Sequence, residues 1–75
     1  MATLVRLGRA YIRMFANDHY PPHFHIWTPD GEAMVLLEDF SLMRGVVRRD
    51  ELKMVQEWAR KNRDMLDMEW RRLNG

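Results

Sequence analysis

The stretch Asn17-Asp18-His19-Tyr20-Pro21-Pro22-His23-Phe24-His25 contains all three histidines of the chain and two of its three prolines. We call residues 17–25 the histidine segment. Because adjacent prolines fix their own φ angles and restrict the residue before them, the middle of this segment should be extended and stiff. If a strand follows the prolines, His23 and His25 point to one face of it and Phe24 to the other. The segment therefore predicts a site in which imidazoles converge.

The sequence on both sides of the histidine segment predicts a small antiparallel sheet. Residues 10–15 alternate between two faces, and residues 23–27 are expected to pair with them. Residues 32–37 are nearly all apolar and predict a central strand, with a short further strand at 40–45. Residues 3–7 alternate only weakly and could be a short edge strand. We interpret the whole as a sheet of three to four strands.

After this sheet the apolar pattern changes to a helical period. Apolar residues recur at helical intervals from Leu52 to Leu73. Asn62 interrupts the run and is a plausible N-cap for a second helix. Two helices are favoured because they pack compactly, and one long helix over residues 48–73 is the alternative. The expected fold class is α+β, with residues 1–75 forming a single domain. The predicted core is Leu4, Ile12, Met14, Phe24, Val35, Leu37, Leu52, Val55, Ala59, Leu66 and Trp70.

Composition narrows the kinds of protein this chain can be. At 75 residues, with no cysteine, it can use neither disulfides nor thiolate metal ligands to support its core. A core of this size is marginal alone, so self-association or a second small protein partner is expected. The net charge of +1 is too balanced to predict RNA binding from charge alone. No apolar run is long enough for a membrane span, so a cytoplasmic location is expected.

The histidine segment resembles the signature of a prokaryotic family catalogued as domain of unknown function 4160. The family pattern is an Asp-His-any-Pro-Pro-His-Phe-His run after a strand, and residues 18–25 match each of its fixed positions. The strand-like residues 12–15 and the helical region that follows Gly45 are similar to the family as well, so the resemblance covers nearly the whole chain. One departure is Arg48, where the family usually has proline.

This resemblance implies little about function. Members of the family are often encoded beside another small uncharacterised protein, and such pairs have been proposed as toxin–antitoxin modules. The resemblance thus implies a small cytoplasmic prokaryotic protein that works as one partner of a two-protein complex.

The first hypothesis for the histidines is acid–base catalysis of RNA cleavage without a metal. Imidazole titrates near neutral pH, so two histidines can act as base and acid on a ribose 2′-OH. His23 and His25, with His19 nearby, would supply this pair. Arginines would hold the phosphate. The catalytic candidates are His19, His23, His25 and Arg13, and the substrate-binding candidates are Tyr20, Arg48 and Arg49.

The second hypothesis is a metal site. His23 and His25 at strand spacing, with His19 brought near by the prolines, could give three nitrogen ligands to zinc. Asp18 would be a further ligand or would orient one of them. This spacing matches none of the well-known zinc signatures, so it permits a zinc site without specifying one.

The third hypothesis is a binding module without catalysis. Here the histidines lock the segment through hydrogen bonds, with Asp18 accepting from one of them. Tyr20, Phe24 and Trp27, together with the methionines, would be interface anchors. All three hypotheses turn on one geometric question, which is whether the imidazole rings converge.

Overall fold

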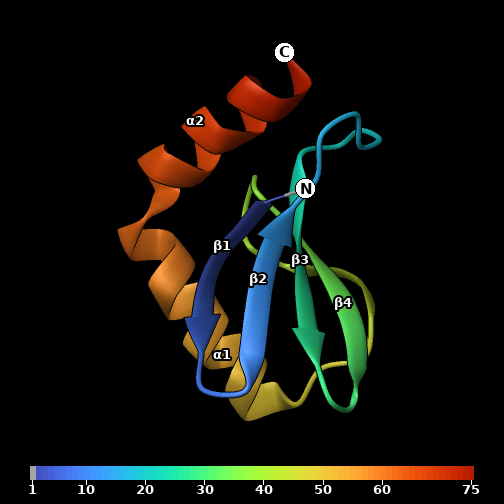
Figure 1. Cartoon of the computed structure of the whole chain (residues 1–75). Helices are drawn as coiled ribbons and strands as arrows, with labels where there is room; N and C mark the ends of the chain where they lie inside the picture. Colours follow the sequence, from blue (N-terminus) through green and yellow to red (C-terminus); the bar gives the residue numbers. More distant parts are fainter. Residues whose placement is uncertain (1) are drawn as a thin grey trace.

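The computed structural model describes the backbone from Ala2 to Gly75 and the side chains from Val5 onward. An antiparallel sheet comes first and two helices follow it, so the predicted α+β class is confirmed. The strands pair in sequence order, β1-β2-β3-β4-β5 (Figure 1). The elements are β1 (Ala2–Leu7), β2 (Ala10–Met14), β3 (His23–Thr28), β4 (Gly31–Leu36), β5 (Leu42–Gly45), α1 (Arg49–Lys61) and α2 (Arg63–Asn74).

The sheet has five strands instead of the three to four predicted. The difference is β1, which pairs with β2 from Ala2 to Leu7. Its register shifts between Thr3 and Val5, as at a β-bulge. A bulge moves the alternation of side chains by one residue, which explains why the strand pattern in this part of the sequence is weak.

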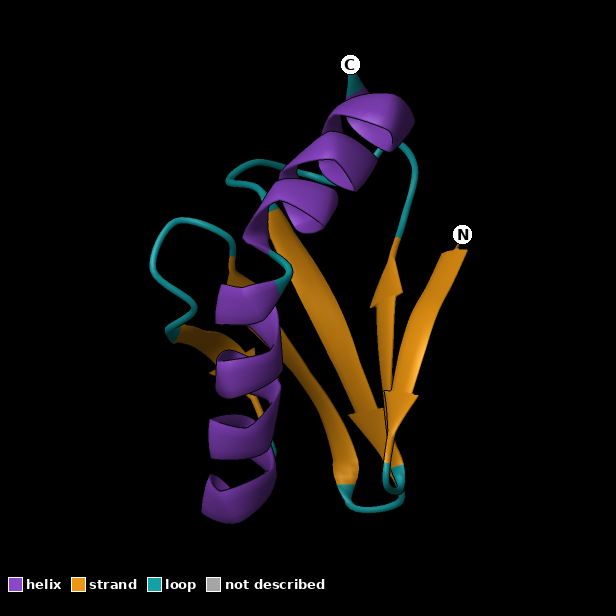
Figure 2. Cartoon of the chain, turned by 90° about the vertical axis from the view of Figure 1, so that its left-hand side faces the viewer, coloured by secondary structure: helices purple, strands orange, loops and turns teal. Residues whose placement is uncertain are grey.

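Both helices cover the same face of the sheet, which we call the inner face (Figure 2). The alternation of β2 shows how the sequence creates it: Ala10, Ile12 and Met14 are buried, whereas Tyr11 and Arg13 are half-buried. Successive residues of a strand point to opposite faces, so Tyr11 and Arg13 belong to the outer face.

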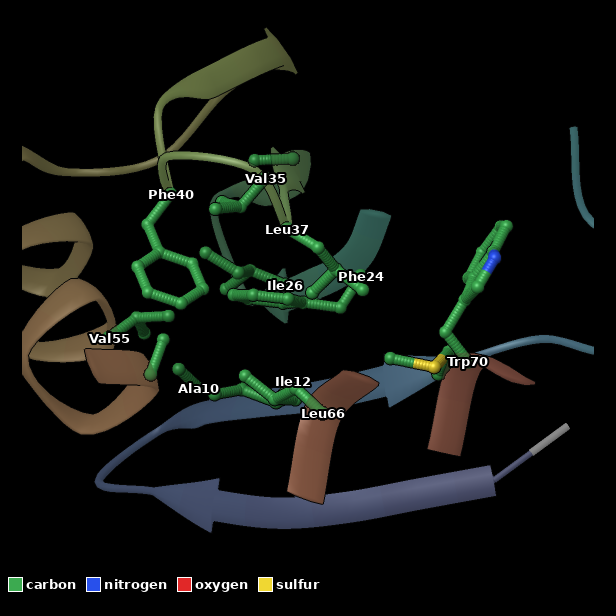
Figure 3. Packing of buried hydrophobic residues seen from close by; sticks show 13 residues of the cluster. Ala10, Ile12, Phe24, Ile26, Val35, Leu37, Phe40, Val55, Leu66 and Trp70 are labelled. Atoms are coloured by element: carbon green, nitrogen blue, oxygen red, sulfur yellow. The ribbon is translucent and has the colours of Figure 1, made fainter. Parts of the chain in front are cut away.

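The core lies between the inner face and the helices (Figure 3). Nine predicted core residues are buried in it, namely Ile12, Met14, Phe24, Val35, Leu37, Val55, Ala59, Leu66 and Trp70. Leu52 is only partly buried, and the side chain of Leu4 lies outside the described residues. The core also contains four side chains that the sequence did not single out, namely Ala10, Ile26, Ala33 and Phe40.

Phe40 shows why the predicted strand at 40–45 begins too early. Its φ angle is 60°, in the left-handed region, so the chain turns there and β5 starts only at Leu42. The ring is buried below the guanidinium of Arg63, whose Cζ lies 4.3 Å from the ring centroid. Gln56 of α1 donates a hydrogen bond of 2.7 Å to the Phe40 carbonyl and fixes the turn to the helix layer.

Asn62 separates α1 from α2, so the two-helix prediction is confirmed, and Asn62 occupies the predicted N-cap position of α2. The Asn62 side chain makes no capping hydrogen bond to α2. Its Nδ2 instead donates to the carbonyl of Trp58 at 2.8 Å, which satisfies an orphan carbonyl at the end of α1. Among the described residues, no helix is long and apolar enough to cross a membrane.

Arg9 ties together the end of the sheet that lies farthest from the histidine segment. It lies in the turn between β1 and β2, and its guanidinium donates to both carboxylate oxygens of Glu51 in α1, at 2.9 and 2.8 Å. It also pairs with Asp30, in the turn between β3 and β4. These hydrogen bonds raise the pKa of Arg9. One side chain therefore links two turns of the sheet to the first turn of a helix.

Candidate functional site

The candidate site lies at the opposite end of the sheet, where β2 ends and β3 begins. The residues between these strands fold back toward the end of α2. Asn74 of α2 accepts a hydrogen bond of 2.8 Å from the backbone N–H of Asp18 and donates one of 3.1 Å to the carbonyl of Phe15. The last turn of the molecule therefore fixes the position of Asp18.

The prolines do not give the extended stretch that was predicted. Tyr20 and Pro21 form a bend, and the peptide bond between them is cis. After the bend, β3 begins directly at His23. His23 and His25 lie on the same side of this strand, with ring centroids 5.0 Å apart, as the alternation predicts.

The centre of the site is one carboxylate oxygen. Asp18 Oδ2 lies 2.9 Å from His25 Nε2 and 3.0 Å from His23 Nε2. Asp18 Oδ1 accepts the backbone N–H of His19 at 2.9 Å, so the carboxylate has a fixed orientation. Ligand atoms of Asp18, His23 and His25 all lie within 4.8 Å of one another, which is the spacing of a group able to hold a metal ion.

The other nitrogen of His23 decides what its Nε2 can do. His23 Nδ1 lies 2.7 Å from the Pro21 carbonyl, which can only accept, so Nδ1 must carry a proton. In the neutral ring Nε2 then carries a lone pair, and this lone pair faces the oxygen of Asp18. His23 Nε2 is buried and has no hydrogen-bond partner among the described residues. A proton or a metal ion between these two atoms would remove the repulsion.

His25 has a similar arrangement with a carboxylate in place of the carbonyl. Its Nδ1 is buried without a hydrogen-bond partner in the described part of the chain, and it lies 3.4 Å from Glu32 Oε2. If Nδ1 carries a proton, it faces Glu32 favourably and Nε2 directs its lone pair at Asp18. In both histidines, Nδ1 thus faces an oxygen acceptor, and Nε2 faces the same oxygen of Asp18.

Electrostatics keep Asp18 ionised. Burial disfavours its charged form, but the hydrogen bond from His25, the backbone N–H of His19 and the charges of His23 and His25 together outweigh burial. The pKa of Asp18 is therefore lowered from its ordinary value. A carboxylate that stays charged beside two imidazoles is suited to bind a metal ion.

The site is recessed and partly open. His23 is fully buried, His25 is nearly so, and the side chain of Asp18 is 14% exposed. The edge of the Phe15 ring contacts His25 at a centroid distance of 4.6 Å, and Trp70 lies 5.6 Å from His23. These aromatic walls lower the local polarity, so charge interactions inside the site are stronger than at the surface.

His19 is the third predicted histidine, and it lies at the entrance. Its ring stacks on His23 with centroids 4.7 Å apart, and its side chain is 55% exposed. His19 Nε2 is 3.8 Å from Asp18 Oδ1, so it is near the carboxylate but outside the three-residue group. The three rings therefore converge, with two inside the site and one on its rim.

Of the remaining candidates, Arg13 lies beside the site. It is the register partner of His25 across β2 and β3, so the two side chains share the outer face. Tyr20 is exposed and packs its ring edge on Trp70 at 6.2 Å. The structure does not bring Arg48 and Arg49 to the histidines: both are exposed around the start of α1, at the far end of the sheet (Figure 1).

Three contributors to the site were not found from the sequence: the Pro21 carbonyl, Glu32 and Asn74. The sequence has no local signal for the role of a backbone carbonyl. Glu32 reaches His25 across a strand pair, and Asn74 reaches Asp18 from 56 residues away in the chain. Such contacts depend on register and helix placement, which the local pattern does not encode.

Comparison with known proteins supports the family resemblance. The family model described as "Domain of unknown function (DUF4160)" matches residues 10–71, which include the whole histidine segment and most of both helices. No curated protein and no solved structure matches the chain. Because the matched region covers well over half of the sequence, the chain belongs to the DUF4160 family.

Proposed function

We propose that this domain binds a divalent transition metal, with zinc the best match, through Asp18, His23 and His25. The observation that carries the proposal is that both histidines face an acceptor with Nδ1 and the same Asp18 oxygen with Nε2. Two nitrogens and one carboxylate oxygen are a ligand set that zinc accepts readily.

The distances support a preorganised site. Zinc bonds of about 2.0–2.1 Å place neighbouring ligand atoms of a tetrahedral site roughly 3.3 Å apart. The two nitrogens lie 2.9 and 3.0 Å from Asp18 Oδ2. A shift of a few tenths of an ångström would therefore admit the ion, and only side-chain rotation is needed for it.

The partners of Nδ1 also fit a metal site. Histidines that bind metals usually donate their second N–H to a carbonyl or a carboxylate, which fixes the ring and raises its basicity. Pro21 supplies the carbonyl for His23, and Glu32 supplies the carboxylate for His25. A bound ion would also give a partner to His23 Nε2, which is otherwise buried without one among the described residues.

Three protein ligands leave a coordination position for water or a substrate. His19 stands at the rim on the exposed side, where it can exchange protons with a molecule bound there. Metal-free cleavage of RNA by His23 and His25 has less support, because the fully buried His23 cannot touch a substrate.

The test is metal binding by protein purified without a histidine tag. We expect one zinc per chain by elemental analysis, and a tetrahedral absorption spectrum after loading with cobalt(II). Asp18→Asn keeps the shape of the side chain but removes its charge, and it should lower zinc affinity at least tenfold. Glu32→Gln should lower it about 10- to 100-fold, as expected for a residue that orients a ligand.

His19→Ala is the matched control, since it removes a histidine of the same segment but not a ligand of the group. It should bind zinc with the affinity of the wild type, whereas Asp18→Asn and Glu32→Gln should bind zinc more weakly. Sub-stoichiometric zinc in the wild type would reject the proposal, and so would equal loss of zinc in His19→Ala and Asp18→Asn. Far-UV circular dichroism of each variant confirms that it is folded.

A second candidate function is self-association, in which the partner is a second copy of this chain. The outer surface of α2 favours it: Met65 and Met68 are exposed and line a hollow of about 380 Å³ beside the ion pair of Glu69 and Arg72. A second copy related by twofold symmetry would place Arg72 near Glu69 of its neighbour. Sedimentation equilibrium should show a dimer that Met68→Glu dissociates, and a monomer at every concentration would reject this candidate.

A further inference from the structure

The outer face of the sheet carries two rows of side chains, and apart from His25 and Glu32 the metal site leaves them unexplained. The register places Arg6, Tyr11, Trp27 and Glu32 in one row across β1 to β4. The adjacent row contains Arg13, His25, Met34 and Arg44. Because both helices lie on the inner face, these rows are on the face without helices (Figure 2).

Aromatic rings and guanidinium groups alternate on this face. The rings of Tyr11 and Trp27 lie 5.8 Å apart, and Trp27 is 41% exposed although it belongs to an interior strand. The guanidiniums of Arg6 and Arg13 lie 5.3 and 5.6 Å from the centroid of the Tyr11 ring. An exposed tryptophan in the middle of a sheet costs solvation free energy, which a ligand that covers it would recover.

We propose that this face binds single-stranded nucleic acid. Every base has a flat face that can stack on an aromatic ring or a guanidinium plane, and every phosphate is an acceptor for arginine. The face presents Trp27 and Tyr11 for stacking and Arg6, Arg13 and Arg44 for phosphates, against a single acid in these rows, Glu32. Its charge is therefore complementary to a polyanion.

The same charges disfavour a second copy on this face. Two copies packed face to face would bring arginines against arginines, and like charges across an interface are costly. Duplex nucleic acid is also a poor fit, because its bases are already stacked and cannot lie on Trp27. A single strand uses both kinds of side chain at once.

The face leads directly to the metal site. Arg13 is the register partner of His25, so a strand held by the arginines has one end next to Asp18 and the rim histidine, His19. The binding proposal does not depend on metal, since none of its contacts uses the three ligand residues. The two proposals can therefore fail separately.

The test is fluorescence anisotropy of a labelled 12-nucleotide RNA of mixed sequence, in EDTA so that bound metal has no influence. Trp27→Ala should weaken binding about tenfold through the loss of one stacked base, and Trp27→Phe should restore most of it. A single-stranded DNA of the same sequence distinguishes RNA from nucleic acid in general. Comparable affinity for both assigns the face to single strands of either kind.

A pair of arginine variants separates specific phosphate contacts from overall charge. Arg6→Gln with Arg44→Gln should lower the slope of log affinity against log salt by about 1.4, because each phosphate contact on a single strand contributes roughly 0.7. Arg49→Gln with Arg60→Gln removes the same charge from exposed positions of α1 and should leave the slope unchanged.

Several results would overturn the proposal. They are the absence of binding by the wild type at low salt, equal weakening by the two double variants, and binding of duplex RNA as tight as that of the single strand. A tryptophan emission shift that depends on protein concentration and is lost in Trp27→Phe, together with a dimer in sedimentation, would show that a second copy covers the face and would also overturn it.

Discussion

At the scale of single residues, Asp18 is the centre of the candidate site. One of its oxygens lies within 3.0 Å of a ring nitrogen of each inner histidine, and its backbone N–H donates to Asn74. The sequence supported a ligand role for this aspartate and a role in locking the histidine segment. The structure combines them, because the hydrogen bond from the His19 N–H to Asp18 Oδ1 fixes the carboxylate with Oδ2 toward the histidines.

Stability should depend on the ionisation of Asp18. Its pKa is lowered in the folded chain, whereas an unfolded aspartate titrates near 3.9. A lowered folded pKa contributes stability that is present above about pH 4 and is lost as the pH falls through the folded pKa. Urea unfolding in EDTA should therefore show a loss of stability on acidification that is smaller in Asp18→Asn.

At neutral pH, Asp18→Asn itself should cost about 1–3 kcal/mol, because a charged acceptor is replaced by a neutral one. Asp64→Asn, in the exposed first turn of α2, is the control and should keep the acid dependence of the wild type. An acid limb that is identical in Asp18→Asn and the wild type would contradict the assigned role.

The histidine segment shows what could be predicted at this scale and what could not. Strand alternation after the prolines correctly predicted that His23 and His25 share a side. It could not predict the acceptors at their Nδ1 atoms, because the Pro21 carbonyl is positioned by a bend and Glu32 by strand register. The sequence thus identified Asp18, His23 and His25 as candidate ligands, but it could not predict which ring nitrogens carry protons.

At the scale of elements, most strands and both helices lie within one or two residues of the prediction. The alternation of buried and half-buried residues is clear in β2, and β2, β3 and β4 pair without a register shift between them. It failed at the ends of elements where a single residue changes direction. Phe40 turns inward with a positive φ. The Asn62 side chain donates a hydrogen bond to the end of the preceding helix and makes none to the following one.

Gly45 is an element boundary that should not tolerate a side chain. Its φ is +105°, and an added Cβ would lie 2.3 Å from the carbonyl oxygen of Glu32 and 2.5 Å from Cα of Ala33. Both atoms belong to the backbone of β4, so the β4–β5 pairing would have to open. We expect Gly45→Ala to cost at least about 2 kcal/mol of unfolding free energy, measured by urea denaturation.

Gly8→Ala provides a matched control for this prediction. Gly8 has φ +60° but no atom within 4 Å of an added Cβ, so only backbone strain of about 1 kcal/mol is expected. The difference between the two variants isolates the steric clash with β4. Equal losses would show that the close approach at Gly45 is not a constraint.

At the scale of the whole molecule, one end of the sheet carries the candidate site and the other end is joined to α1 by ion pairs. The Asp18 site is held at one end by α2, and Arg9 fastens the other end to α1. The sequence could not predict that Arg48 and Arg49 lie away from the histidines, because no local pattern indicates at which end of the sheet a helix begins. They lie with Arg9, on the far side from the histidines (Figure 1).

Removing the Arg9 guanidinium should loosen that end without touching the site. Arg9→Gln leaves Glu51 largely buried and without its paired donors, so the melting temperature should fall by several degrees. Arg49→Gln changes the exposed first residue of α1 and should leave the melting temperature nearly unchanged. Zinc affinity should be the same in both variants, and a change in Arg9→Gln would show that the two ends are coupled.

The contact between Trp70 and His23 turns the site into its own optical probe. The indole is almost fully buried with its ring centroid 5.6 Å from the imidazole, so its emission reports whether that imidazole is bare, charged or coordinated. Trp27, in contrast, is exposed to solvent, so we expect it to emit at longer wavelength. With Trp27 and Trp58 both replaced by phenylalanine, Trp70 is the one tryptophan left in the sequence, and a titration in a fluorimeter follows events at the imidazole with no attached dye.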